Sequence, residues 1–578
     1  MACCTLRTVL SAHPSTFEYK MPFQLVLHAQ AHRGQMEAAA LPHSATRLEN
    51  LSLTGLGDLQ SIGARAGADA WLQLSRKTSR RLESTSSAVT GRLFNGVKQR
   101  SFPRSQLHFA EGSRVPKAVT RVHSNAIDEL KCNSTRWAVA TTISEPSEGI
   151  RRMSWRTGWC LVVVADRNGP PSWSRWMGRG GAPLCAKSTK YLTVEDQEAL
   201  GRRNTSTAAF ISAVPWAHFG RKNVGFLYAI AQGATELFDF DDDNWLYPAD
   251  RVNQHSVIAG YSKKKLHNVL TPALTIATCT AAAIDVPTNS AAASIAGSPS
   301  AVVNPYPLMR ASNPAAWPRG LPYPDIRRSG ATPLLIGEGE CLDASRTLFA
   351  HSIAVMQSVA DHDPDVDAIY RLTATQSELH FSFLRDGPAL VLPPGIFAPI
   401  NAQATLHMRK AMWGALLPTT VHGRVSDIWR GYLHQRLYWD IGLQLAFTSP
   451  SVTQQRNAHN YLADMQSELP LYERAGELVR MLTVWRCDDD GTRSLPSCME
   501  ALWVEAYERS YLEKADVHLV QRWLAALADV GYRFPPRLST QQRKQHEETE
   551  LAAWNESLCT ALPSPNGCNA SVHRHLPG

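Results

Sequence analysis

Two Val-rich apolar runs constrain the fold of this chain most strongly. They are "RWAVATTI" (136–143) and "GWCLVVVAD" (158–166), and each has the length of a strand and ends at a turn signal. A nearly continuous apolar run is typical of a strand that is buried on both faces, as the central strands of parallel sheets are. The sequence therefore predicts an α/β fold built on a parallel sheet.

The next segment predicts a helix, a short strand and an acidic cluster, in that order. Val224, Leu227, Tyr228 and Ala231 recur at the spacing of one helix face, and Gly233 stands where a C-terminal cap belongs. "TELFDF" follows as a short strand. Open α/β sheets bind their ligands beyond the carboxyl ends of the strands, so the acidic residues that come next lie where a ligand site is expected.

Four carboxylates form this acidic cluster: Asp239, Asp241, Asp242 and Asp243. A calcium loop of the EF-hand type fits poorly, because the required Gly and Glu positions hold Asn244 and Asp250, and Pro248 interrupts the exiting helix. A solvated acidic turn is the simpler alternative, and "RCDDDGTRS" further along the chain has the composition of one. Carboxylates that crowd against a buried strand repel each other, however, and a bound cation relieves that repulsion. A divalent metal site and a solvated turn both remain open.

Charge and composition argue against nucleic-acid binding and against a membrane span. The formal net charge is +8, but residues 1–130 alone carry 16 Lys+Arg and 9 Asp+Glu, so the rest of the chain is nearly balanced. No apolar stretch reaches the roughly 20 residues that cross a bilayer. The 11 cysteines show no zinc-finger spacing, and their odd number fits either reduced thiols or disulfides with a thiol left over.

The chain is expected to divide into four parts. Residues 1–134 lack helix or strand periodicity and are predicted to be a poorly ordered basic leader. Residues 135–445 form the α/β domain, in which 262–302, rich in Ala, Ser and Thr, is a surface loop insertion. Residues 446–545 are predicted to be mainly helical, and 546–578 a flexible tail.

Three further helices can be predicted with their boundaries. The run 427–447 is apolar nearly all round, as a buried helix would be. Asp363 is a predicted N-cap with Pro364 at the first helical position. Asp516 is a second predicted N-cap, for a helix that ends at Gly531.

The pair of carboxylates one residue apart suits glycosyl transfer from a nucleotide-diphosphate sugar. In that reaction Mn²⁺ or Mg²⁺, held by carboxylates, neutralises the departing diphosphate. The order of helix, strand and Asp-x-Asp is found in glycosyltransferases of the GT-A fold. The acidic cluster is therefore expected to hold a divalent cation beside a nucleotide sugar.

Beyond this motif, the chain resembles the STELLO-type family of GT-A-fold glycosyltransferases. The blocks that carry the resemblance span about residues 136–475 and include "RWAVATTISEPSEGI", "PWAHFGRKNVGFLYAIAQGATELFDFDDDN", "WPRGLPYPDI", "DPDVDAIYRLT", "PPGIFAPINAQATL", "RVSDIWRGYLHQRLYW" and "QQRNAHNYLADMQSELPLY". The resemblance implies a GT-A-like sheet flanked by helices, followed by a mainly helical C-terminal region. It also implies Mn²⁺ or Mg²⁺ as cofactor, a UDP- or GDP-linked donor, a glycan or polysaccharide acceptor, and association with polysaccharide synthase complexes. Membrane-set members carry an N-terminal anchor and face the Golgi lumen, whereas this chain shows a polar leader, so a Golgi location is implied by the family alone.

The resemblance also implies roles for individual residues near the cluster. Asp241 and Asp243, with Asp239 and Asp242 beside them, would form the metal and nucleotide-sugar site. Asn223 would face the base or ribose, and Arg221 or Lys222 a phosphate. The alternative for Arg221 and Lys222 is an exposed pair at a helix start, where positive charge is mildly unfavourable without an anion.

A second set of candidate residues surrounds Asp427, which opens the apolar run 427–447. Asp427 could be a base that deprotonates the acceptor hydroxyl, or an N-cap held in an ion pair. The flanking Arg424 and Arg430 are predicted to contact substrate. Trp317, Arg319 and Trp429 could line an acceptor site, although buried aromatic residues are more often structural.

The sequence analysis thus favours a metal-dependent glycosyltransferase. The alternatives are a non-catalytic GT-A-like scaffold that assembles with Golgi polysaccharide-synthesis machinery, because a fold does not guarantee chemistry, and a sensor that binds a sugar nucleotide or calcium.

Overall fold

A computed structural model gives the structure of much of the chain between Lys98 and His546. The residues that it describes are 98–109, 132–173, 188–247, 302–326, 353–385, 390–392, 394–456, 459–488 and 491–546, with the backbone of 273–276 and 346–349. Most of the predicted leader, of the surface loop 262–302 and of the tail therefore lies outside the described residues.

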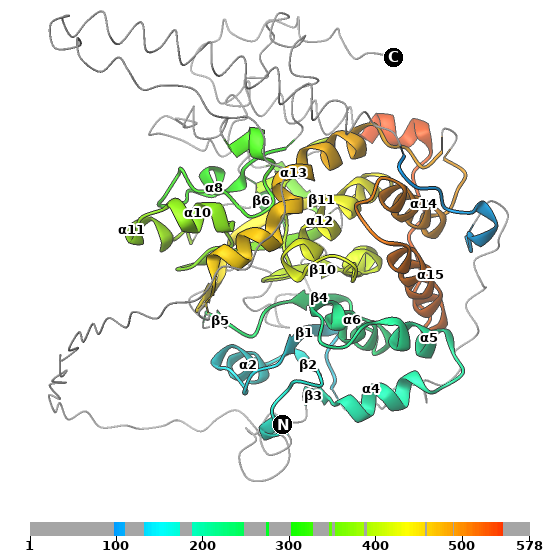
Figure 1. Ribbon diagram of the computed structural model, residues 1–578, viewed down its shortest axis with the longest axis horizontal. Coiled ribbons are helices and arrows are strands. Elements are labelled where there is room, and N and C mark those ends of the chain that lie inside the picture. The colour runs from blue at the N-terminus through cyan, green and yellow to red at the C-terminus, as the bar shows by residue number, and fades with distance from the viewer. Residues whose placement is uncertain are drawn as a thin grey trace, which may run out of the picture. The chain divides into compact units, whose positions relative to one another are not determined.

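A nine-stranded mixed sheet forms the centre of the fold (Figure 1). Its order is β3-β2-β1-β4-β10-β8-β11-β5, and β9 pairs with β11 off this path. The strands are β1 (Arg136–Thr142), β2 (Cys160–Ala165), β3 (Thr189–Leu192), β4 (Glu236–Asp239), β5 (Asn244–Leu246), β8 (Ile353–Asp361), β9 (Leu390–Leu392), β10 (Thr405–Met408) and β11 (Gln444–Gln454). A separate two-stranded sheet joins β6 (Ala273–Ile276) to β7 (Arg346–Phe349).

The direction of the strands sets the edge at which the acidic cluster emerges. β1 runs parallel to both β2 and β4, and Val139 of β1 pairs with Asp239, the last residue of β4. β10 is antiparallel to β4 and to β8, while β11 runs parallel to β8. The two predicted apolar runs are thus neighbouring central strands, and the acidic residues follow β4 as expected.

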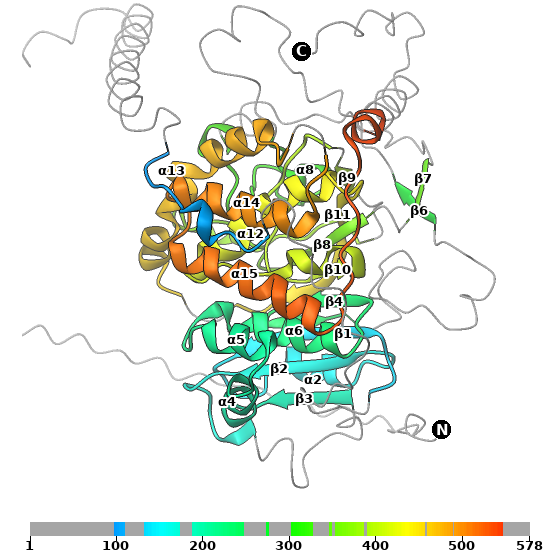
Figure 2. The same ribbon diagram turned by 90° about the vertical axis from the view of Figure 1, so that its right-hand side faces the viewer.

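Helices cover both faces of the sheet and continue into a helical C-terminal region (Figure 2). The α-helices are α2 (Glu148–Ser154), α4 (Val194–Gly201), α5 (Ser206–Ala213), α6 (Lys222–Ala231), α8 (Pro305–Leu308), α10 (Ala368–Thr373), α11 (Gln376–Leu379), α12 (Gly423–Trp439), α13 (Tyr461–Val484), α14 (Leu495–Glu508) and α15 (Lys514–Asp529). Short 3-10 helices are η1 (Arg104–Gln106), η3 (Phe219–Arg221) and η6 (Arg409–Ala415). The predicted class, an α/β sheet flanked by helices and followed by a helical region, is confirmed.

Alternate residues of β1 belong to two cores, one on each face of the sheet. Trp137 and Val139 join the larger core with α6, whereas Ala138 joins a smaller core with Ile150 of α2. Gly225 lets α6 approach the sheet closely, because a Cβ there would lie 2.6 Å from a methyl carbon of Val139. This close packing fixes the start of α6 beside the carboxyl end of β4.

The helix predicted from Val224, Leu227, Tyr228 and Ala231 is confirmed as α6, but four other helix boundaries were predicted wrongly. Gly233 has φ +87° and closes α6 as predicted. The predicted helix 427–447 is wrong at both ends. α12 begins at Gly423 with His422 as its N-cap, so Asp427 lies inside the helix and is not the predicted N-cap. It ends at Trp439, and residues 444–447 belong to β11. The helix predicted to start after Asp363 starts four residues later, with Asp367 as its N-cap. The helix predicted to start at Asp516 is α15. Its N-cap is Glu513, and Asp516 lies in its first turn.

Residues 98–109, which fall inside the predicted leader, pack against the C-terminal helices. The backbone N–H groups of His108 and Phe109 donate to the buried carboxylate of Glu500 at 2.7 and 2.9 Å, and Phe102 donates to Glu508. Figures 1 and 2 both show this blue segment beside α14. The predicted boundary at 445/446 falls within β11.

Among the described residues the structure has two disulfides, which agrees with the second of the two alternatives for the odd cysteine count. Cys132–Cys160 ties the chain before β1 to the first residue of β2, and Cys487–Cys498 ties the α13–α14 connection to α14. Across the described ranges, none of the helices is both long and apolar enough to cross a membrane.

Candidate functional site

The acidic turn, which we define as residues 241–244, connects β4 to β5. The Asn244 N–H donates to the Asp241 carbonyl at 3.1 Å, and the Asp241 N–H donates to the Asn244 side chain at 3.3 Å. The Gln455 N–H donates to the Asp243 carbonyl at 3.0 Å, which joins the turn to the end of β11. Local hydrogen bonds and a neighbouring strand therefore hold the turn in place.

Each carboxylate of the acidic turn has a hydrogen-bond donor from a different element. The Thr142 hydroxyl, at the end of β1, donates to Asp242. The Gln454 amide, at the end of β11, donates to Asp243 at 3.1 Å. The Lys222 ammonium, at the start of α6, lies 3.0 Å from Oδ1 of Asp241. Since 35% of the Asp241 side chain is exposed, its second oxygen is accessible to a ligand.

Asp239 is separated from the turn by its burial and by its cations. Its side chain is fully buried, and its two oxygens lie 2.8 Å from the Lys222 ammonium and 2.8 Å from the Arg430 guanidinium. Lys222 also donates to the Ala402 carbonyl at 3.3 Å. The buried Lys222 thus bridges Asp239 and Asp241, and both oxygens of Asp239 are already neutralised.

The electrostatics of the cluster favour an additional positive charge near the turn. Burial raises the pKa of Asp241 to about 7; Lys222 opposes this rise, while Asp243 and Asp239 add to it. Burial also raises the pKa of Asp243, an effect that Gln454 opposes. Burial alone would lower the pKa of Lys222, but its two carboxylates outweigh burial and raise it. Because Asp241 is partly exposed, solvent screens part of the repulsion that it experiences.

The acidic turn offers the oxygen ligands that a divalent cation prefers, although its three carboxylates do not lie within 4.8 Å of one another in this conformation, and Asp239 is not available. Mg²⁺ and Mn²⁺ prefer carboxylate, carbonyl and water oxygens, which Asp241, Asp242 and Asp243 offer. Both oxygens of Asp239 already face cations, so in this structure it is not available to a metal ion. The predicted metal ligands therefore divide into three that the structure groups in the turn and one that it places behind them.

Gly149, at the start of α2, is required for the shape of the acidic turn. A Cβ there would lie 2.4 Å from the Asn244 carbonyl and 2.7 Å from the Asp242 carbonyl. Both are backbone atoms, which cannot move aside as a flexible side chain can. The hydroxyl of Ser147, which caps the same helix, donates to the Asp242 carbonyl.

Asn223 and Arg221 lie near the cluster in sequence, but the structure gives their side chains other partners. The Asn223 amide exchanges two hydrogen bonds of 2.8 Å with the backbone of Leu417. The Arg221 guanidinium donates to Gln197 and to two backbone carbonyls, and it stacks 3.6 Å from the Trp216 ring centroid. Only Lys222 of this predicted group contacts the acidic cluster.

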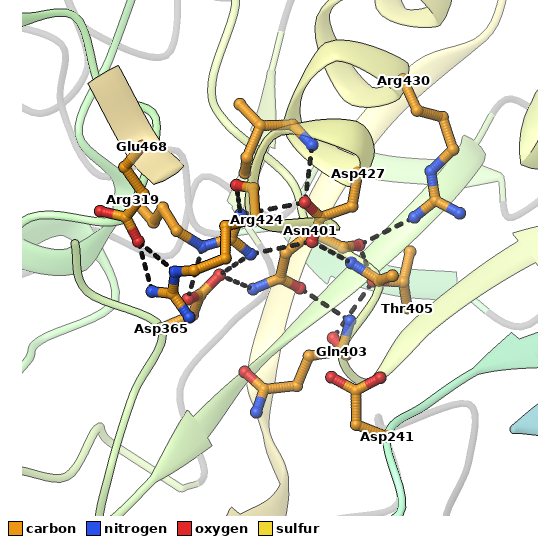
Figure 3. Close-up of polar contacts among 12 residues, drawn as sticks. Asp241, Arg319, Asp365, Asn401, Gln403, Thr405, Arg424, Asp427, Arg430 and Glu468 are labelled. Carbon is orange, nitrogen blue, oxygen red and sulfur yellow. Dashed lines mark hydrogen bonds and ion pairs between the residues drawn. The ribbon is translucent and has the colours of Figure 1, made fainter. Parts of the chain in front are cut away.

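Asp427 belongs to a second polar network centred on Arg319 (Figure 3). Arg319 donates to both oxygens of Asp427, at 3.0 and 2.8 Å, and to both oxygens of Asp365, at 3.0 and 2.9 Å. The Ile428 and Ala402 N–H groups fill the remaining acceptor positions of Asp427. Asp427 therefore has no free acceptor position for an acceptor hydroxyl in this conformation.

The two predicted arginines beside Asp427 also hold ion pairs. Arg424 pairs with the buried Glu468 and lies 3.8 Å from Asp464. Arg430 pairs with Asp239 and donates to the Asn401 carbonyl at 3.1 Å.

The two predicted tryptophans occupy structural positions. The Trp317 ring nitrogen donates to Asp367 at 2.6 Å, and its ring meets Tyr370 edge-on. Trp429 is 1% exposed and packs edge-on against Tyr511. In this conformation Trp429 presents no open face for a sugar, whereas Trp317 is only partly buried.

Loop residues 401–405, which were not predicted, connect the acidic cluster with the Arg319 network. The Ala402 carbonyl accepts from Lys222, and its N–H donates to Asp427. The Asn401 amide donates to Asp365 at 2.7 Å. Figure 3 shows Asn401 and Gln403 between Asp241 and Asp365. The alternating acids of "DPDVD" were the sequence signal for Asp365, but their partners come from distant parts of the chain.

Two cavities lie away from the acidic turn. One of about 20 Å³ is lined by polar residues including Gln357, Asp365, Asn401 and Gln403. A larger cleft, of about 1080 Å³, lies between residues 98–107 and α14 and shares no lining residue with the turn.

Among the described side chains, Cys487, Asp488 and Cys498 have metal-like spacing, but disulfide sulfurs lack the thiolate that binds metal.

Comparison with known proteins bears out the resemblance to STELLO proteins. The family model described as STELLO glycosyltransferases matches residues 424–559. "Probable glycosyltransferase STELLO2" of Arabidopsis thaliana is 26% identical over 432 residues, which are 74% of this chain and 49% of that protein. "Probable glycosyltransferase STELLO1" of the same plant is 25% identical over the same shares. The chain spans about half the length of the curated relatives that it matches.

Proposed function

Because the chain is related to the STELLO glycosyltransferases, we propose that it transfers a sugar from a nucleotide-diphosphate donor to a glycan or polysaccharide acceptor, using Mn²⁺ or Mg²⁺. The observation that carries this proposal is the acidic turn. It sets three carboxylates beyond β4, with an exposed oxygen on Asp241 and hydrogen-bond donors behind each carboxylate. A scaffold would have no use for this arrangement.

In this proposal Asp241, Asp242 and Asp243 hold the divalent cation. When bound, the cation supplies the positive charge that stabilises the departing nucleoside diphosphate. Lys222 orients Asp241, Thr142 orients Asp242 and Gln454 orients Asp243, so that three elements of the fold position the ligands. The donor is UDP- or GDP-linked.

The role of Asp427 as the base for the acceptor depends on movement of Arg319. Arg319 occupies one acceptor position on each Asp427 oxygen, so it must release at least one oxygen before that oxygen can accept a proton from a sugar hydroxyl. Without that movement, Asp427 positions the 401–405 loop through Ala402, and the proton leaves to another acceptor.

A non-catalytic scaffold of polysaccharide-synthesis machinery is the second candidate. The observation that favours it is that Asp239 and Asp427 are both fully engaged by cations of the protein itself. A scaffold would keep these ion pairs for folding and would need neither donor nor cation.

Thermal unfolding separates the two candidates. We expect Mn²⁺ together with a UDP- or GDP-sugar to raise the melting temperature of the wild type, and this shift to disappear in Asp241→Asn. Asp196→Asn, which alters a surface ion pair instead, serves as the control and should keep the shift. If no sugar nucleotide shifts the wild type with any divalent cation, the scaffold is supported.

A further inference from the structure

Arg456 directly follows the stretch of β11 that contacts the acidic turn. Gln454 donates through its side chain to the Asp243 carboxylate at 3.1 Å, and the Gln455 N–H donates to the Asp243 carbonyl at 3.0 Å. Both contacts go to Asp243, so they tie the end of β11 to one residue of the turn. Arg456 is therefore presented beside the turn by a well-held segment, although it is distant from the turn in sequence.

The Arg456 guanidinium is buried with almost no partners. Its side chain is 7% exposed, and its single ion pair is a long one, 3.5 Å from Nε to Oδ1 of Asp363. Within the described ranges it forms no hydrogen bond, and Nε is among the buried atoms without a hydrogen-bond acceptor. Asp363 already has a closer cation, because Arg371 lies 2.6 Å from the same oxygen and donates to the Pro364 carbonyl.

A buried guanidinium without acceptors is unusual on physical grounds. Its Nε–H donor loses its water, and an unsatisfied buried donor carries a desolvation cost, whereas the two terminal nitrogens are not among the enclosed atoms and stay accessible to water or to a ligand. Buried polar groups in folded proteins are nearly always hydrogen-bonded, so the unpaired Nε–H and the terminal nitrogens, which have no acceptor among the described residues, leave room for an acceptor from a ligand. Planar guanidinium groups bind phosphate through two parallel hydrogen bonds.

The charge of Arg456 also reaches the acidic turn. Burial raises the pKa of Asp243, and Arg456 is one of the groups that oppose this rise. Arg456 has the same effect on Asp365 of the second network, whose pKa the adjacent Arg319 holds well below its usual range. The charge of Arg456 is thus felt by both the turn and the Arg319 network.

We propose that the Arg456 guanidinium binds a phosphate of the nucleoside diphosphate whose cation is held by Asp241, Asp242 and Asp243. The inference rests on the proposed function, and it adds a phosphate-binding residue next to the stretch of β11 that contacts Asp243. Arg456 neutralises phosphate charge that the cation does not cover. The competing explanation is that Arg456 is only a second counter-ion for Asp363.

The experiment compares phosphate-dependent binding in charge-matched variants. Calorimetric titrations in Mn²⁺ measure the affinities of UDP and uridine, and of GDP and guanosine, for wild type, Arg456→Gln, Arg456→Lys and the double variant Arg456→Gln/Asp363→Asn. The double variant removes the guanidinium and its Asp363 partner together, so the local charge balance is kept. Melting temperatures confirm that each variant is folded.

We expect the diphosphate to bind more tightly than the nucleoside in wild type, and Arg456→Gln to reduce this ratio about tenfold or more. Nucleoside affinity should change less than about twofold, because a nucleoside lacks the phosphate that Arg456 would bind. The ratio for Arg456→Lys should lie between those of the wild type and Arg456→Gln, because an ammonium keeps the charge but loses the paired donors. The double variant should remain as weak as Arg456→Gln.

Two results would overturn the inference alone. One is an unchanged ratio in Arg456→Gln, and the other is recovery of diphosphate affinity in the double variant, which would make Arg456 a counter-ion of Asp363. If neither UDP nor GDP binds the wild type in Mn²⁺ or Mg²⁺, the proposed function itself is contradicted, and this inference falls with it.

Discussion

Substitution of Lys222 by Met tests whether a buried ammonium holds the acidic cluster together. Lys222 is fully buried and lies 2.8 Å from Asp239 and 3.0 Å from Asp241. Met has a similar length but no charge, so Lys222→Met leaves Asp239 with Arg430 alone and Asp241 without a cation. The network would then have one uncompensated negative charge.

The expected loss of stability follows from this burial. Removing one partner of a buried ion pair typically costs about 3–5 kcal/mol. The lower half of that range is expected here, because the pKa of Asp241 is already raised to about 7 and the carboxyl can take up a proton when Lys222 is removed. We therefore expect Lys222→Met to lower the free energy of unfolding by about 3 kcal/mol.

The loss should depend on pH in a defined direction. A carboxyl whose pKa is raised by folding binds more protons in the folded than in the unfolded protein, so its contribution to stability falls as the pH rises. Removing Lys222 raises the pKa of Asp241 further. The cost of Lys222→Met should therefore be larger at about pH 8 than at about pH 5.

The assay is urea unfolding followed by circular dichroism, with two comparison variants. Lys190→Met breaks an ion pair of the same 3.0 Å length to Asp196, but one that is partly exposed, and it should cost less than about 1 kcal/mol. Lys222→Met/Asp241→Asn restores the charge balance and should recover part of the loss. A Lys222→Met cost no greater than that of Lys190→Met, or no recovery in the double variant, would refute the reasoning.

Three further predictions concern the turn and the core. Gly149→Ala should displace the acidic turn and cost about 1–3 kcal/mol, with weaker Mn²⁺ binding in calorimetry and unchanged secondary structure. Burial lowers the pKa of His434 to about 3. The free energy of unfolding should therefore fall as the pH drops below about 6.5, by up to about 1.4 kcal/mol per pH unit. In His434→Gln the free energy of unfolding should fall less steeply with decreasing pH, which acid unfolding measures. Loss of Cys132–Cys160, whose sequence separation is 28, in the double variant Cys132→Ala/Cys160→Ala should cost about 3–4 kcal/mol in urea unfolding, and equal stability of this variant and the wild type would contradict this.

The sequence predicted the centre of the fold because its signals there are local. The continuous apolar runs of β1 and β2 can be accommodated only by strands covered on both faces, and Gly233 marks the end of α6 through its positive φ. The run 427–447 misled because burial alone does not distinguish a helix from a strand. Gly442, with φ +68°, lies at the break between α12 and β11.

The site was predictable only in part, because its pairings join distant residues. The composition "DFDDD" indicated a cation site, but it could not show that Lys222 and Arg430 already neutralise Asp239. In the same way, the flanking arginines suggested a partner for Asp427, whereas its actual partner is Arg319, 108 residues away. Contacts of this kind are fixed by the packing of the sheet and α12, which no local pattern records.

The central claim is that the acidic turn binds a divalent cation together with a nucleoside diphosphate. Anomalous diffraction from crystals of the protein grown with Mn²⁺ and UDP or GDP tests it most directly. The account predicts one manganese peak bound by oxygens of Asp241 and its neighbours in the turn, with diphosphate density on the same ion, and loss of the peak in Asp241→Asn. A manganese peak held elsewhere, or diphosphate bound away from the turn, would contradict it.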